Sequence, residues 1–190
     1  MAKRMKVMTA VVSCCTILFT VCYILTELGW ILTAAITFGT FSYHLLMRLA
    51  VGWIMNGIMH NQADLNHPWF RLHSFEKRLY RTLKIKRWKN KLPTYSPELF
   101  DSAKHTYLQI AQAMCQAEIV HECIMVLSFL PLFASLIFGE FGVFLITSIL
   151  AAIFDSFFVM IQRFNRPRVL KLAEYQLHRL SSNIQQEQVP

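Results

Sequence analysis

Residues 8–26 of the chain read MTAVVSCCTILFTVCYILT, and this stretch carries no charged side chain. Residues 141–154, FGVFLITSILAAIF, are uncharged as well. A helix needs roughly 20 apolar residues to cross the hydrocarbon core of a bilayer. Here the apolar residues come in long runs rather than at amphipathic spacing, which indicates an integral membrane protein.

Working outward from these two stretches, we expect four transmembrane helices, at about 7–26, 30–55, 120–139 and 141–161. The chain has 190 residues and a net charge of +8, with 19 Lys and Arg residues. All of these basic residues lie before the first span, within 48–104 or after residue 162. The short connections at 27–30 and 139–142 contain none of them.

This alternation of basic and base-free connections predicts the topology, because Lys and Arg concentrate in cytoplasmic connections of membrane proteins. We expect an all-α integral membrane protein whose four transmembrane helices form two hairpins within one membrane domain, residues 1–190. Both termini and the basic segment 56–117 are predicted to be cytoplasmic. Glu27 and Glu140, in the base-free connections, are then expected on the outer side.

The basic segment contains a candidate interfacial helix at 74–91. Phe75, Leu79, Leu83 and Trp88 fall near one helical face, with Lys and Arg around the rest. Such a cytoplasmic amphipathic helix dips its apolar side chains into the headgroup region while its cations meet anionic lipid. Basic and aromatic residues also interleave in nucleic-acid-binding proteins. The chain has no recognised module of that kind, so we predict membrane lipids as partners and no nucleic acid.

Two prolines lie within or beside the last two spans. Pro131, inside the third, is expected to kink the helix or open its backbone hydrogen bonds toward a neighbour. Pro167 is expected to end the fourth helix, leaving 168–190 as a short amphipathic tail. The stretch 98–117, which precedes the third span, is predicted to be helical.

Ionisable side chains within apolar spans are candidates for function, because desolvating them is costly unless they are paired. The sequence places six of them in the cytoplasmic halves of their predicted helices: His44, Arg48, Glu118, His121, Glu122 and Asp155. Glu118 and His121 share a helical face, so the carboxylate could orient the imidazole as a base. Simple solvation in the headgroup region is the alternative. Asp155 is expected to pair with Arg48 or His44, either structurally or within a site.

The fourth span is followed by a polar motif, Gln162-Arg163-Phe164-Asn165-Arg166-Pro167-Arg168. Its planar guanidinium groups are suited to bidentate binding of phosphate or carboxylate at the membrane surface. An ordinary basic flank of a transmembrane helix is the alternative.

Four segments occur in an order and at a spacing that resemble one known family. They are Phe75-Glu76-Lys77, the run Lys86 to Lys91 with Leu92-Pro93, Ala117-Glu118-Ile119-Val120-His121, and Gln162 to Arg168. Together they are similar to the glycosyl-4,4′-diaponeurosporenoate acyltransferases, the CrtO-type enzymes of bacterial staphyloxanthin biosynthesis. The resemblance covers roughly residues 50–170 and is most specific in the last segment.

The resemblance implies a bacterial cell-membrane enzyme that esterifies a fatty acyl chain onto a glycolipid-like acceptor, a glycosylated carotenoid in that family. We expect His121 as the base, Glu118 as its orienting partner, and Asn165 or Arg166 stabilising the oxyanion. No cofactor is predicted beyond an acyl donor such as acyl-CoA or acyl carrier protein. Substrate contacts are expected from Gln162, Arg163, Arg168, Trp88, Lys89, His44, Arg48 and Asp155.

Other readings of the same residues stay open. The chain could be a non-enzymatic membrane protein that binds lipid or regulates a partner, with its polar residues serving structure. His44 and His121 with Glu118 or Asp155 could hold zinc or iron, but no dense histidine motif supports this, and we predict no metal. The sequence has neither a Gly-x-Ser-x-Gly nor a His-x4-Asp motif, which argues against a covalent acyl-enzyme.

Overall fold

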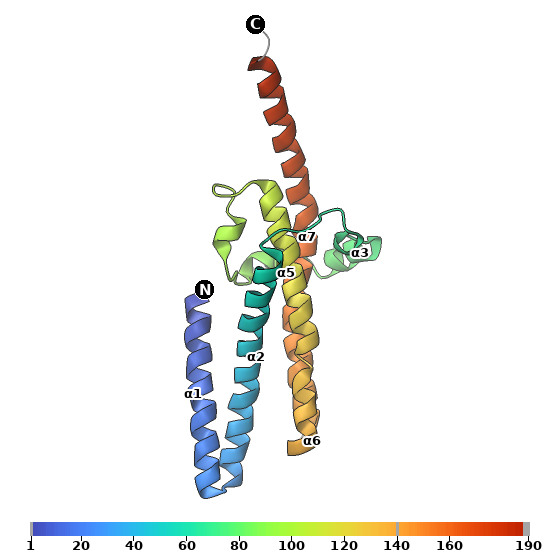
Figure 1. The fold of residues 1–190 in the computed structure, drawn as a ribbon. Helices are drawn as coiled ribbons and strands as arrows, with labels where there is room; N and C mark the ends of the chain where they lie inside the picture. Colours follow the sequence, from blue (N-terminus) through green and yellow to red (C-terminus); the bar gives the residue numbers. More distant parts are fainter. Residues whose placement is uncertain (1, 140, 188–190) are drawn as a thin grey trace. The chain divides into compact units, whose positions relative to one another are not determined.

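The computed structural model describes residues 2–139 and 141–187, and these residues form helices and connections without a β-strand. Glu140 and residues 188–190 of the predicted tail lie outside the described residues. The order along the chain (Figure 1) is α1 (Ala2–Thr26), α2 (Gly29–Met59), η1 (Pro68–Phe70), α3 (Ser74–Thr82), α4 (Ile85–Trp88), η2 (Lys89–Lys91), η3 (Pro97–Phe100), α5 (Tyr107–Leu127), η4 (Leu130–Ala134), α6 (Ser135–Phe138) and α7 (Phe141–Glu187).

Four helical segments are long and apolar enough to cross a membrane: Ala2–Thr26, Gly29–Met59, Tyr107–Phe138 and Phe141–Ser181. This confirms the predicted all-α class with four candidate spans. The apolar side chains of α1 are largely exposed, Leu25 for example at 78%. Exposed apolar surface costs about 25 cal/mol per Å² in water, so these side chains suit a lipid environment. The transmembrane hairpins and the side on which each terminus lies stay predictions.

The chain divides into two compact units. The first consists of Met1–Ile54 and Cys123–Ile153, and the second of Met55–Glu122 and Phe154–Pro190. In the first unit α1 runs beside α2 (Figure 1), where Phe19 stacks on Phe38 at 5.2 Å and the Ser13 and Ser42 hydroxyls are 2.7 Å apart.

Pro131 interrupts the third span, as predicted. The helix α5 ends at Leu127, and a 3₁₀ turn containing Pro131 follows. A residue in a continuing helix would donate its N–H to the carbonyl four residues back, but proline has no N–H. The carbonyl of Leu127 instead accepts a hydrogen bond from the Tyr43 hydroxyl at 2.7 Å. A side chain of α2 therefore satisfies the carbonyl that Pro131 leaves open.

Pro167 does not end the fourth helix, contrary to prediction. The helix α7 runs without a break from Phe141 to Glu187. A proline inside a helix costs about 3 kcal/mol, so contacts on both sides of it must offset that cost. Before it, Arg163 and Arg166 are anchored in the protein interior. After it, Ala173 is buried, which fixes the next turns in place.

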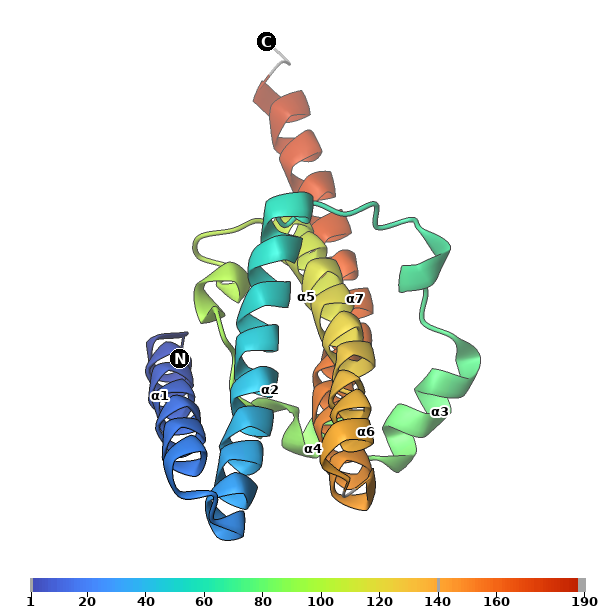
Figure 2. The same ribbon diagram turned by 60° about the horizontal axis from the view of Figure 1, so that its bottom comes forward.

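The predicted helix 74–91 is two short helices and a 3₁₀ turn rather than one. Lys84, between α3 and α4, has a left-handed backbone with φ of 51°, and the chain changes direction there (Figure 2). The Trp88 indole N–H donates to the Leu83 carbonyl at 2.9 Å across this break. Phe75 and Leu79 stay exposed on α3, and their membrane-surface role stays a prediction. In the stretch 98–117, regular α-helix begins at Tyr107, later than expected.

Candidate functional site

Four buried charged side chains of the second unit form one network, which we call the arginine network: Glu76, Glu118, Arg163 and Arg166. The Glu118 side chain is 0% exposed and lies between the two guanidinium groups. One of its oxygens accepts from Arg163 Nη1 at 2.5 Å, and the other accepts from Arg166 Nη1. Two arginines and two glutamates balance in charge, as burial of ionised groups requires.

The same arginines hold the segment that leads into α3. Arg163 Nε donates to Glu76 Oε1 at 2.5 Å, and its two terminal nitrogens donate to the carbonyls of Trp69 and Arg71 at 3.0 Å. Arg166 donates to the Phe70 carbonyl at 2.5 Å, and its guanidinium lies 5.0 Å from the centre of the Phe70 ring. The network therefore fixes residues 69–76 onto α5 and α7.

Glu76 is the part of this network that lies outside the candidate spans. Burial raises the pKa of its carboxyl, but hydrogen bonds from Arg163, from the His73 N–H and from the Tyr80 hydroxyl outweigh that effect, and the net pKa is lowered. The pKa of Tyr80 is raised, first by its burial and then by its hydrogen bond to Glu76. Both shifts favour a Glu76 carboxylate that stays ionised at neutral pH.

His121 pairs with Asp155 rather than with Glu118. Its Nδ1 lies 2.9 Å from Asp155 Oδ1. An ionised carboxylate can only accept, so beside an Asp155 carboxylate Nδ1–H is the donor. The Asp155 side chain is 1% exposed, whereas that of His121 is 23% exposed. The imidazole also stacks on Phe158, with ring centres 4.6 Å apart. Glu118 is therefore not the orienting partner that its spacing predicted, because both of its oxygens are taken by arginines.

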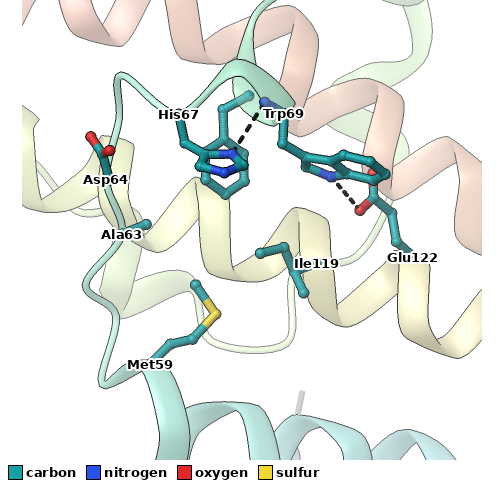
Figure 3. A pocket seen from close by; sticks show the side chains of 8 residues that line it. Met59, Ala63, Asp64, His67, Trp69, Ile119 and Glu122 are labelled. Carbon is teal, nitrogen blue, oxygen red and sulfur yellow. Dashed lines mark hydrogen bonds between the residues drawn. The ribbon is translucent and has the colours of Figure 1, made fainter.

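A cavity of about 390 Å³ lies beside η1, and we call it the apolar cavity (Figure 3). Figure 3 shows the Trp69 indole N–H pointing at the Glu122 carboxylate, which it reaches at 2.9 Å. The ring nitrogen Nδ1 of His67 accepts the backbone N–H of Trp69 at 3.2 Å. The remaining walls are mainly apolar and include the side chains of Met59, Phe70 and Ile119.

The other polar residues of the C-terminal motif face a different neighbour. Lys89 Nζ donates to Asn165 Oδ1 at 2.6 Å and lies 5.5 Å from the centre of the Phe164 ring. The Arg168 guanidinium lies 4.8 Å from the same ring. Burial lowers the pKa of Lys89, and the nearby charges of Arg168 and Lys86 lower it further. Gln162 is half-buried on α7, and Trp88 packs edge-to-face on Phe157.

The predicted residues His44 and Arg48 belong to the first unit, where His44 is buried and Arg48 Nη1 donates to the His44 carbonyl at 3.2 Å. The pairing of Asp155 with either residue stays a prediction. Across residues 2–139 and 141–187, no group of three or more His, Cys, Asp and Glu side chains is placed to hold a metal ion.

Prediction from the residues missed Trp69 and did not connect Glu76 to the arginines. Glu76 appeared only as part of a motif shared with one family. One signal was available: a glutamate just inside the start of α3, at a position where a carboxylate can accept the free N–H groups of a helix end. That signal explains the bond from the His73 N–H at 2.7 Å but not the partner Arg163.

The geometry described above lies within the region that matches a known family. The model of the glycosyl-4,4′-diaponeurosporenoate acyltransferase family matches residues 66–175. That range contains the whole arginine network and the His121–Asp155 pair. Comparison with the curated proteins and with the solved structures gave no match.

Proposed function

Because the chain belongs to the glycosyl-4,4′-diaponeurosporenoate acyltransferase family, we propose that it transfers a fatty acyl group to a hydroxyl of a glycolipid-like acceptor. The four apolar helices support a protein of the membrane. The acceptor's lipid part would lie in a bacterial cell membrane, with its hydroxyl at the cytoplasmic leaflet. The acyl donor, a carrier thioester such as acyl-CoA or acyl carrier protein, would approach from the cytoplasm.

The observation that carries this proposal is the His121–Asp155 pair. A buried carboxylate that accepts the Nδ1 proton fixes one tautomer and leaves Nε2 with its lone pair. This is the arrangement by which an imidazole serves as a general base for hydroxyl groups. The partial exposure of His121 is compatible with substrate access, while the Phe158 ring holds the imidazole plane.

In the proposed reaction Nε2 of His121 takes the proton of the acceptor hydroxyl as that oxygen attacks the thioester carbonyl carbon. The tetrahedral intermediate then expels the carrier sulfur, which recovers the proton from His121. One ester bond forms and one thioester bond breaks, with no change in oxidation state. Asn165 is proposed to stabilise the oxyanion through Nδ2, since its Oδ1 accepts from Lys89.

The buried arginines receive a different role from the one predicted. Arg163 and Arg166 already donate to protein carboxylates and carbonyls, so we assign them to positioning residues 69–76 rather than to binding substrate. That segment supplies Trp69, which holds Glu122 at the apolar cavity. We propose that this cavity receives an apolar part of a substrate, with Glu122 accepting from a hydroxyl nearby.

An acyl-transfer assay on purified protein, with labelled acyl-CoA and a glycolipid acceptor, tests the proposal. His121→Ala should lower the rate roughly 10²- to 10⁴-fold, the usual contribution of a general base. Asp155→Asn should lower it as well, and Asp155→Glu should restore part of the loss. His178→Ala, an exposed histidine on α7 outside the matched region, is the control and should keep full activity.

The non-enzymatic reading is the other candidate, and one observation favours it. Phe75, Leu79 and Leu83 are exposed on and just after a basic helix, which suits binding to a membrane surface without any chemistry. Full acyl transfer by folded His121→Ala protein would refute the base mechanism. No transfer by wild-type protein from any carrier thioester would favour the lipid-binding function.

A further inference from the structure

The second unit has another cavity, of about 480 Å³, which we call the basic cavity. Lys77 and Arg81 of α3, Lys84 of the connection, Lys86 of α4 and Arg168 of α7 line it. Among the described residues, none of the side chains that line it is acidic. Five cationic residues from three helices and one connection therefore line the basic cavity.

These five cations differ from the arginines of the arginine network. Arg163 and Arg166 are each matched by a buried glutamate. Within the described part of the chain, no ion pair neutralises Lys77, Arg81, Lys84, Lys86 or Arg168. Nearby like charges repel one another, and the charges of Arg168 and Lys86 add to the lowering of the Lys89 pKa that burial causes first. A bound anion would relieve this repulsion.

Apolar and aromatic side chains also line the basic cavity. Ile85 is fully buried there, and the rings of Tyr80 and Phe164 meet edge-to-face at 6.4 Å. Arg168 lies over Phe164, so a cation and a ring face the same space. A small inorganic ion would use the cations alone. An organic phosphate ester would use both the cations and the apolar lining.

We infer that the basic cavity binds the phosphate groups of the acyl donor's carrier, a coenzyme A-type phosphate ester. The inference rests on the proposed function, because it assigns a place to the donor of that reaction. A phospholipid headgroup offers the same phosphate chemistry from a second source. We choose the soluble carrier because the cations line a cavity that also has aromatic and aliphatic side chains, rather than a flat basic surface.

Binding is measured by titrating coenzyme A into the full chain held in nanodiscs of neutral phosphatidylcholine. The double variant Arg81→Gln/Lys86→Gln should raise the Kd at least about ten-fold, since each charged hydrogen bond to phosphate contributes strongly. Lys104→Gln/Lys171→Gln removes the same charge from exposed positions outside the cavity and should leave the Kd unchanged. Pantetheine, which lacks the phosphates, should bind at least ten-fold more weakly than coenzyme A.

Three results would overturn the inference: no binding of coenzyme A, equal binding of pantetheine, or equal loss in the control variant. Phosphatidylglycerol vesicles that displace coenzyme A competitively, or that bind where coenzyme A does not, would assign the cavity to lipid headgroups instead. His121→Ala should still bind coenzyme A as wild type does. If coenzyme A does not bind but the protein still transfers acyl groups, the basic cavity is rejected as the donor site and the proposed function stands.

Discussion

At the scale of single residues, the two buried carboxylates Asp155 and Glu118 have different partners. His121 and Asp155 were both candidates, but their partnership joins two helices and depends on a register between helices that sequence spacing does not contain. Glu118 was the nearer carboxylate along the chain, and two guanidinium groups outcompeted the imidazole for it. The sequence showed that the chain is rich in Lys and Arg. It did not show that Glu76 and Glu118 neutralise Arg163 and Arg166 in the interior.

The charge state of Glu76 leads to a prediction about pH. Its folded-state pKa is lowered, so the carboxylate stabilises the fold above its unfolded pKa, which is about 4.3, and that stabilisation is lost as pH falls toward the folded value. We expect Glu76→Gln to lower the free energy of unfolding by roughly 3 kcal/mol at pH 7, as expected for breaking a buried ion pair. The measurement is Tm in neutral detergent between pH 7 and 3.

The variant's deficit should begin to shrink as the pH falls below about 4.3, where the unfolded chain takes up a proton at Glu76, and it should be lost as the pH passes through the lowered folded-state pKa. Glu98→Gln, an exposed glutamate of η3, is the matched control and should follow wild type throughout. A deficit of the same size at pH 7 and pH 3 would show that charge at Glu76 does not support the fold.

At the scale of elements, the sequence predicted that the four long helices exist, but it did not predict where several of the helices end. Long apolar runs predicted the four spans, and Pro131 predicted the interruption of the third. The prediction that Pro167 ends the helix was wrong. Proline locally disfavours a helix, but buried contacts on both sides of Pro167 keep α7 helical. The break at Lys84 had no signal in the sequence, since a left-handed backbone at lysine is uncommon.

The hydrogen bond from Tyr43 to Leu127 gives a prediction for the interrupted span. Tyr43→Phe should lower the free energy of unfolding by about 1 kcal/mol, because it leaves the Leu127 carbonyl without a donor. In a Pro131→Ala background, residue 131 regains an N–H that can reach that carbonyl. The same Tyr43→Phe change should then cost less, and a double-mutant cycle of unfolding in detergent measures the difference. Equal costs in both backgrounds would mean that Pro131 and Tyr43 are not linked.

At the scale of the whole molecule, the charge distribution makes the broadest prediction. The base-free turn at Glu27 is expected on the outer side, and Glu98, within the basic segment, on the cytoplasmic side, because Lys and Arg are retained in the cytoplasm. The donor inference depends on this topology, since the basic cavity lies in the segment predicted to face the cytoplasm. A soluble carrier could not reach it from outside.

Single cysteines at positions 27 and 98, placed in a background without the five natural cysteines, test this topology. A membrane-impermeant maleimide should label position 27 on intact cells and position 98 only after the membrane is opened. Cysteine at position 3, in the N-terminal basic cluster, should behave as position 98 does, because an even number of spans returns the chain to the same side. Labelling of position 98 on intact cells would place the basic cavity outside, where no cytoplasmic carrier thioester reaches it. That single result would contradict the topology and remove the soluble acyl carrier as the ligand of the basic cavity.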